Sequence, residues 1–230
     1  MPPLVIAHRG ASGHAWENSP TAFRLAHELG ADGVELDVHA TRDGGLIVHH
    51  DAAIPGLGPI SELTSATIAT ARLPNGEPIP TLVQALDLLR GLDVWVEVKA
   101  LPPAADAALF AALEAGPTPD RYAVHSFDHR IIARLGRARP TLRFGALEAS
   151  YQFDPAQVLR ETGAETLWQE QHLVDADLVR VVARAGGQVI AWTANEPADI
   201  ARLVRAGVHG ICGNYPERIR ALVAQGPGSD

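Results

Sequence analysis

The sequence predicts a (β/α)8 TIM barrel that forms one domain over residues 1–230, with a tail from about residue 226 that is expected to fray. Three observations support this prediction. Eight short apolar runs alternate with about eight helical patterns, and no stretch has the composition of a linker. Polar residues gather at the C-terminal ends of the apolar runs, where such a barrel carries its active site. An open doubly wound sheet is the alternative, but no Gly-rich dinucleotide loop follows the first run.

The predicted strands are short and apolar, which is typical of parallel strands buried on both faces. The first run, Leu-Val-Ile-Ala, leads directly to His8, Arg9 and Gly10. The eight strands are expected over residues 4–7, 34–38, 94–98, 122–125, 142–147, 166–169, 189–191 and 208–212.

The predicted helices begin at capping residues or prolines and end at glycines. Ser19 is expected to cap a helix whose first residue is Pro20 and which ends at Gly30. Asp154 and Asp175 are expected to cap two later helices. Helices are expected over about residues 20–29, 81–90, 104–115 and 128–138, with others from positions 155, 176, 197 and 216. A Pro/Gly-rich connection over residues 52–80 is expected to hold one short helix near residues 62–71.

Two carboxylates lie two positions apart on the second predicted strand. Apolar residues at positions 34, 36 and 38 alternate with Glu35 and Asp37, so both carboxylates share one face. A turn at residues 43–45 then reverses the chain into a second apolar run that ends at His49, His50 and Asp51. Buried carboxylates are usually paired or bound to a metal, so this hairpin predicts a metal site beside a proton-transfer group. A half-exposed hairpin with ordinary surface acids is the alternative.

The carboxylates at the strand ends indicate which kind of metal ion would bind. Glu35, Asp37 and Glu97 offer oxygen ligands and no thiolate, which favours one divalent cation, Mg²⁺ or Ca²⁺, over zinc.

Four other residues complete a catalytic set. His8 and His50 are candidates for proton transfer, and Arg9 and Lys99 supply positive charge for an anionic substrate. Together with the predicted cation, these groups indicate hydrolysis of a phosphate ester. Ser126 also ends a strand, where a hydrogen bond is its expected role.

Composition excludes several classes of partner. The net charge of −8 argues against nucleic acid and against docking on anionic membranes. No apolar run reaches the roughly 20 residues of a membrane span. Cys212 is the only cysteine, so no internal disulfide can form. The N-terminus does not resemble a signal peptide, and a cytoplasmic location is therefore expected.

Seven stretches resemble the glycerophosphodiester phosphodiesterase family, in that family's order. They are AHRGASGHAWENSPTAF, GADGVELDVHATRDGGLIVHHD, PIPTL, VEVKA, HSFD, VIAWTANEP and GNYPERI, and they span almost the whole chain. The resemblance implies a (β/α)8 barrel that hydrolyses small glycerophosphodiesters to glycerol 3-phosphate and an alcohol.

The resemblance also implies a role for each site residue. His8 and His50 would be the acid and the base, and Glu35, Asp37 and Glu97 would bind one divalent cation. Arg9 and Lys99 would contact the phosphate, and Trp192 would pack against the glycerol. Glu17 and Asn18 would support the site.

Three positions depart from the family pattern. Trp16 stands where proline is usual, and the connection after Asp51 is short. The last predicted strand leads into Cys212-Gly213-Asn214, where a Thr-Asp pair is common. None of these departures is expected to touch the proposed metal ligands or catalytic histidines.

The adjacent pair His49 and His50 requires a choice. On a strand that ends at Asp51 they would point to opposite faces, and the His-Asp pair favours His50. The eight histidines other than His8 and His50 are expected to be structural or exposed, His125 among them.

Other functions stay open at this point. A lysophospholipase D or sphingomyelinase D type of enzyme would need apolar access at the barrel mouth, and a barrel could also bind phosphorylated ligands without turnover. The cation can be Mg²⁺ or Ca²⁺, and either His8 or His50 can be the acid. The attacking group can be water or the neighbouring glycerol hydroxyl, and the protein can be a monomer or a homo-oligomer.

Overall fold

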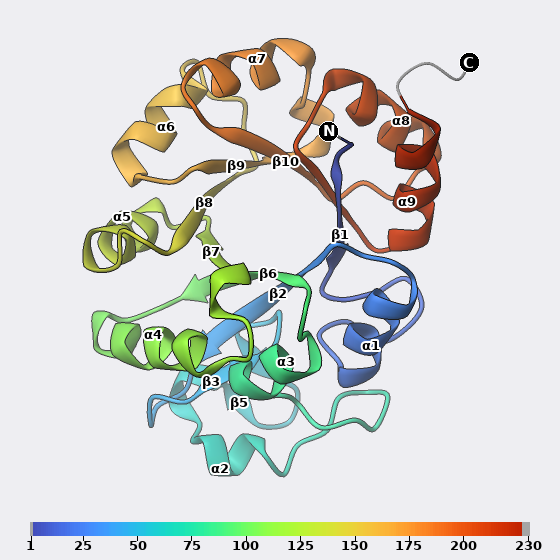
Figure 1. The fold of residues 1–230 in the computed structure, drawn as a ribbon. Coiled ribbons are helices and arrows are strands. Elements are labelled where there is room, and N and C mark those ends of the chain that lie inside the picture. The colour runs from blue at the N-terminus through green and yellow to red at the C-terminus, as the bar shows by residue number, and fades with distance from the viewer. Residues whose placement is uncertain (1, 227–230) are drawn as a thin grey trace.

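Eight parallel strands close into a barrel surrounded by helices in the computed structural model, which describes residues 2–226 (Figure 1). The strands follow one another around the barrel in chain order, and the last pairs with the first to close it. They are β1 (Leu4–His8), β2 (Gly33–Ala40), β6 (Asp93–Ala100), β7 (Tyr122–Ser126), β8 (Arg143–Glu148), β9 (Thr166–Glu170), β10 (Gln188–Trp192) and β11 (Gly210–Gly213). The predicted (β/α)8 barrel is confirmed.

One detail of the sequence prediction differs at the end of the chain. The last strand was expected from residue 208, but its ladder begins at Gly210, which pairs with Leu4 and Ile190. The tail that was expected to fray from about residue 226 lies, apart from Gly226, outside the described residues.

The outer helices begin where capping side chains accept backbone N–H groups. Ser19 caps α1 (Pro20–Glu28) through the N–H of Ala22, and Asp154 and Asp175 cap α6 (Pro155–Thr162) and α7 (Ala176–Arg184), as predicted. The helices are α1 (Pro20–Glu28), α3 (Leu82–Leu88), α4 (Asp106–Ala115), α5 (His129–Ala138), α6 (Pro155–Thr162), α7 (Ala176–Arg184), α8 (Pro197–Ala206) and α9 (Pro216–Gln225), with short 3-10 turns η2 (Pro103–Ala105), η3 (Pro119–Arg121) and η4 (Gln171–Leu173). No helix within residues 2–226 combines the length and apolar character needed to cross a bilayer.

The connection between β2 and α3 is more ordered than predicted. Its elements are β3 (Leu46–Val48), which pairs antiparallel with β2, then β4 (Ala53–Ile54), β5 (Gly58–Pro59), η1 (Ile60–Glu62) and α2 (Ser65–Ile68). The helix expected near residues 62–71 is thus a single turn over residues 65–68. A small hydrophobic core holds this insertion together; it consists of Ile47, Ile54, Ile60, Ile68, Leu73 and Ile79. This core and the pairing of β3 with β2 fix the chain on either side of residues 49–51.

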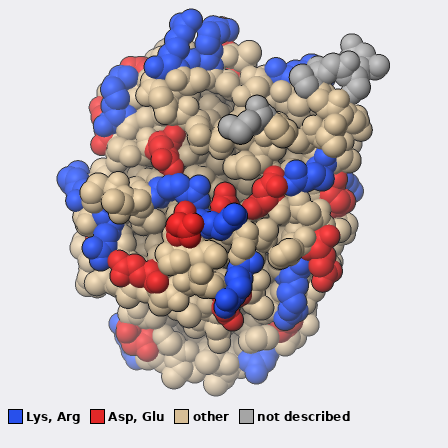
Figure 2. Space-filling model, in the orientation of Figure 1, with Lys and Arg blue, Asp and Glu red and all other residues tan. Residues whose placement is uncertain are grey.

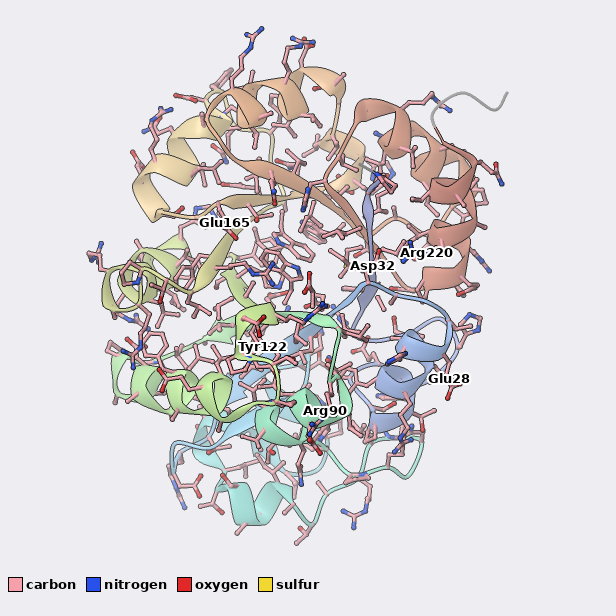
Figure 3. The ribbon with its side chains drawn as sticks, viewed as in Figure 1. Glu28, Asp32, Arg90, Tyr122, Glu165 and Arg220 are labelled. Atoms are coloured by element: carbon pink, nitrogen blue, oxygen red, sulfur yellow. The ribbon has the colours of Figure 1, made fainter. Side chains whose placement is uncertain are left out.

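Ion pairs close the end of the barrel where the strands begin. Figure 3 is viewed from this side and labels Asp32 before β2 and Arg220 on α9, which form an ion pair. The Oδ1 atom of Asp93, at the start of β6, lies 3.5 Å from Arg121 Nη1 and 3.9 Å from Arg143 Nη2. Acidic and basic side chains alternate across this face in Figure 2. The opposite end, where the strands finish, is the one that carries the predicted site residues.

Candidate active site

Three carboxylates converge at the C-terminal ends of β2 and β6. Apolar residues of β2 at positions 34, 36 and 38 pack into the outer core, so Glu35 and Asp37 point into the barrel. Parallel pairing of the two strands places Glu97 of β6 opposite Asp37. Each of the three buried carboxylates offers one oxygen, and these oxygens lie within 4.8 Å of one another. The predicted ligand set is therefore assembled, although Glu97 is 60 residues further along the chain than Asp37.

Two basic side chains compensate the carboxylates. The Lys99 Nζ atom lies 2.9 Å from Asp37 Oδ1 and 2.7 Å from Glu97 Oε1. The Nε atom of Arg9 lies 3.1 Å from Asp37 Oδ2. When all three buried carboxyls are ionised, they exceed the two cationic side chains by one negative charge, which a divalent cation would reverse.

The predicted supporting residues hold this arrangement from the loop after β1. Glu17 Oε2 accepts a hydrogen bond from Arg9 Nη1 at 2.7 Å, and Asn18 Nδ2 donates to Asp37 Oδ2 at 2.8 Å. Arg9 and Asn18 both adopt the left-handed region, with φ of 55° and 54°. Gly10 has φ of 79°, and a Cβ there would lie 2.7 Å from the carbonyl carbon of Ala22. Glycine is therefore required where this loop passes under α1.

Burial and charge move the pKa values of the carboxyls in different directions. Burial raises the pKa of Glu35 well above its usual value, and the charges of Asp37 and Glu97 add to the effect. Burial also raises the pKa of Glu97, despite the nearby ammonium of Lys99. Burial acts in the same sense on Asp37, but Lys99 and Arg9 outweigh it and hold the pKa of Asp37 below its usual range.

A hard divalent cation fits this group of residues. Glu35 Oε1 is buried and has no hydrogen-bond partner among residues 2–226, which is costly for a carboxylate oxygen. A cation would satisfy that oxygen and relieve the repulsion that raises the pKa of Glu35. The ligands are all oxygens, which suits Mg²⁺ or Ca²⁺.

Cation binding is expected to release protons. Because the pKa values of Glu35 and Glu97 are raised, both carboxyls retain protons at pH values where free glutamate is ionised, and the cation must displace them. Affinity for Mg²⁺ should therefore increase with pH. Titration calorimetry in buffers of different ionisation enthalpy measures the released protons directly. Binding with no proton release between acidic and neutral pH would contradict this expectation.

Glu97→Gln is expected to remove cation binding without unfolding the protein. The amide has nearly the same shape, and Lys99 retains its contact with Asp37 at 2.9 Å. The variant also removes one of the like charges around Glu35. Without metal, its Tm should lie within about 4 °C of wild type, which corresponds to roughly 1 kcal/mol for a chain of this size. Addition of Mg²⁺ should raise the Tm of wild type only, and a large loss of Tm without metal would make Glu97 a structural residue.

His8 ends β1 beside the carboxylates. Its Nδ1 lies 2.8 Å from Asn214 Oδ1, so Nδ1–H donates and Nε2 carries the lone pair. That Nε2 atom is 3.9 Å from Glu35 Oε2. Burial, with a contribution from the charge of Arg9, lowers the pKa of His8 to about 4. The ring is therefore neutral near pH 7 and has a free nitrogen. The expectation that residues 212–214 touch neither histidine was wrong, because the last loop folds back beside β1 and Asn214 orients His8.

His50 lies in the bend after β3. The strand ends at Val48 and not at Asp51 as expected, so strand alternation does not separate His49 from His50. The two rings still differ in position. His50 Nδ1 lies 2.9 Å from Asp51 Oδ1, and the backbone carbonyl of His50 is 3.0 Å from His39 Nε2. His49 Nδ1 lies 3.0 Å from the carbonyl of Asp51.

A cavity of about 110 Å³ joins these groups at the barrel mouth. Its lining includes His8, Arg9, Glu35, His50, Glu97, Lys99 and Trp192. All predicted catalytic, metal and substrate residues thus line one cavity, except Asp37, which lies next to it in the carboxylate group. Ser126 has the hydrogen-bonding role expected of it, since its hydroxyl donates to the Val98 carbonyl at 2.7 Å.

Sequence reasoning missed part of the cavity wall. Phe127, Leu147 and Trp168 line it, and so does His125, which was expected to be structural or exposed. His125 is buried, neither ring nitrogen has a hydrogen-bond partner among residues 2–226, and Nε2 lies 3.9 Å from Glu35 Oε1. Burial lowers the pKa of His125 to about 3. The available signal was its position at the end of a strand, in register with Glu97.

Comparisons of sequence and of fold relate this chain to known proteins. A family model described as the glycerophosphoryl diester phosphodiesterase family matches residues 8–218. A glycerophosphodiester phosphodiesterase of Caldanaerobacter subterraneus subsp. tengcongensis is 33% identical over 242 residues, which cover 98% of this chain and 100% of the relative.

Two solved structures have the same fold. The first is an Oleispira antarctica phosphodiesterase in complex with the product sn-glycerol-3-phosphate; it has a TM-score of 0.90 and 25% identity, and the match covers 97% of each chain. The second is a glycerophosphodiester phosphodiesterase of Parabacteroides distasonis with a TM-score of 0.88 and 26% identity, over 97% of this chain and 98% of the other.

Proposed function

This chain belongs to the glycerophosphoryl diester phosphodiesterase family and is a phosphoric diester hydrolase, and we propose that it cleaves glycerophosphodiesters to sn-glycerol 3-phosphate and an alcohol with the help of one divalent cation. One observation carries the proposal: two histidines, two cationic side chains and two of the three candidate metal-binding carboxylates line a single cavity. The product bound to the Oleispira antarctica relative is consistent with this substrate class.

Glu35, Asp37 and Glu97 would hold the cation. When bound, the cation supplies positive charge for the phosphate oxygens as negative charge builds up on them. Lys99 lines the cavity and Arg9 borders the same carboxylates, so both can reach a phosphate group placed there. With the carboxylates compensated by a bound cation, Arg9 and Lys99 would be able to form charged hydrogen bonds with the substrate phosphate.

The two histidines differ in the charge of their partners, which supports different roles. His8 is neutral, has Nε2 free, and is oriented by the uncharged amide of Asn214 at 2.8 Å, so it suits a general base that takes a proton from the attacking oxygen. His50 Nδ1 lies 2.9 Å from Asp51 Oδ1, so the carboxylate orients the second ring. We therefore assign His50 as the general acid that protonates the leaving alkoxide.

The glycerol arm is proposed to pack against Trp192. This side chain is half-buried at the end of β10 and lines the cavity together with Phe127, whose ring centroid lies 5.4 Å away. A cavity of about 110 Å³ suits a small polyol better than a bulky alcohol.

Release of glycerol 3-phosphate tests the function directly. The purified protein is incubated with a panel of glycerophosphodiesters, and glycerol 3-phosphate is measured by a coupled dehydrogenase assay. Wild type should release it from at least one member of the panel. Release of glycerol and a phosphorylated alcohol from a choline, ethanolamine or serine ester would mean that the bond between phosphorus and the glycerol oxygen is cleaved instead. That result would contradict the proposal.

A lipid substrate is the second candidate, favoured by exposed aromatic side chains. Four large aromatic side chains in loops that follow barrel strands are exposed: Trp16, Phe127, Tyr151 and Phe153. A lipid substrate needs apolar access at the barrel mouth, and these side chains supply apolar surface from loops other than the short connection after Asp51. Micellar lysophosphatidylcholine belongs in the same panel as glycerophosphocholine. Hydrolysis of the lysolipid alone would favour a lysophospholipase D activity.

A further inference from the structure

The geometry points to a second subsite at the barrel mouth: a groove that binds the leaving alcohol, in which Arg42 selects alcohols carrying a carboxylate or phosphate group. This inference rests on the proposed hydrolysis of glycerophosphodiesters and specifies its substrate. The groove has a volume of about 660 Å³, and its charged and polar lining comprises His39, Thr41, Arg42, His50, Asp51, Ser61 and Lys99.

The groove meets the active-site cavity at two residues. His50 and Lys99 line both hollows. A phosphodiester held at these two side chains would direct one ester arm into the small aromatic cavity and the other into the groove. The glycerol arm suits the cavity of about 110 Å³, so the alcohol arm is left with the larger hollow. This direction also brings the leaving oxygen to the side of the phosphate where His50 lies.

Arg42 is the charged residue of the groove that no neighbour neutralises. Lys99 is paired with Asp37 and Glu97, and Asp51 is paired with His50. Within residues 2–226, the guanidinium of Arg42 forms no ion pair or hydrogen bond, while its backbone N–H donates to the Leu63 carbonyl at 2.9 Å. That backbone contact ties the β2–β3 turn to the insertion and keeps Arg42 beside the groove.

The remaining lining disfavours a quaternary ammonium. Recognition of choline normally uses the faces of aromatic rings, and the groove is lined by no phenylalanine, tyrosine or tryptophan. Its one carboxylate, Asp51, is already held by His50 at 2.9 Å. A free guanidinium instead binds carboxylate or phosphate oxygens in pairs. The hydroxyl of Ser61 is a further polar group on the same wall.

Two substrates that differ by one carboxylate test the inference. Glycerophosphoserine and glycerophosphoethanolamine have leaving alcohols that are otherwise identical. Wild type is expected to have the higher kcat/KM for glycerophosphoserine. Arg42→Gln should lower the serine-to-ethanolamine ratio of kcat/KM about three- to tenfold, the effect of a partly exposed charged hydrogen bond. Arg42→Lys retains the charge without the planar fork and should give an intermediate ratio.

Arg184→Gln is the matched control, because Arg184 is an exposed arginine at the end of α7 and lies outside the groove lining. Its ratio should equal that of wild type. Equal ratios in wild type, Arg42→Gln and Arg42→Lys, with both substrates hydrolysed, would overturn the inference and leave the proposed function intact. If wild type releases no glycerol 3-phosphate from either substrate or from the rest of the panel, the proposed function fails, and the inference fails with it.

Discussion

Replacing His50 with alanine is expected to lower kcat/KM for a glycerophosphodiester with an ordinary alcohol by roughly 10²- to 10⁴-fold, the usual contribution of a positioned acid. His50 stands where the cavity meets the groove, and Asp51 orients its ring. Without it, the alkoxide must leave unprotonated. His8→Ala should cause a loss of similar size, because the attacking oxygen then keeps its proton.

A nitrophenyl ester distinguishes the two roles. Nitrophenolate leaves readily without a proton, so His50→Ala should recover most of its activity on this substrate, while His8→Ala should stay impaired. Steady-state kinetics on both substrates gives the comparison. Rescue of His8→Ala alone would exchange the roles assigned to the two histidines.

His49→Ala provides the control from the adjacent position. Its Nδ1 faces the backbone carbonyl of Asp51, so the variant should lose less than about tenfold in kcat/KM. An inactive His49→Ala together with an active His50→Ala would mean that the wrong imidazole has been assigned to the site.

Removal of the cation is expected to reduce activity by at least about a thousandfold, since a catalytic metal contributes several kcal/mol. Glu35, Asp37 and Glu97 then face one another with only Arg9 and Lys99 as counter-charges. Addition of Mg²⁺ or Ca²⁺ after chelation should restore turnover, and Zn²⁺ should restore it poorly because the ligand set lacks nitrogen and sulfur.

Asp37→Asn extends the same test to the ligands. It removes the carboxylate that Lys99 and Arg9 both contact, and it should abolish the increase in Tm that Mg²⁺ gives wild type. Elemental analysis of the dialysed protein is the control for residual metal. Full activity in excess chelator, from protein shown to be metal-free, would refute metal dependence.

The barrel could be predicted from sequence because its signals are local. Each strand is a short apolar run, and several helices start at a capping residue such as Ser19 or Asp175, whose hydrogen bonds lie within one turn. The shared face of Glu35 and Asp37 is local too, since side chains alternate along any strand. These features depend on backbone sterics between near neighbours, so the sequence alone determined them.

Local sequence patterns did not predict the structure of the insertion after β2. Its six core residues occur at irregular spacing, so no period marks them as one cluster. Packing among them decides the path of residues 46–80, and with it the placement of His50 and Ser61 at the site. The sequence prediction of a loop with one longer helix failed for this reason.

Contacts between distant segments were decided only by the tertiary structure. Asn214 orients His8 from 206 residues away, and His125 faces Glu35 because β7 pairs with β6 in one particular register. The sequence marked His8, Glu35 and the other site residues by type and by resemblance to a family. Which side chains share a cavity, which remain unpaired, and how burial shifts each pKa depend on closure of the barrel, because desolvation and charge pairing act through space and not along the chain.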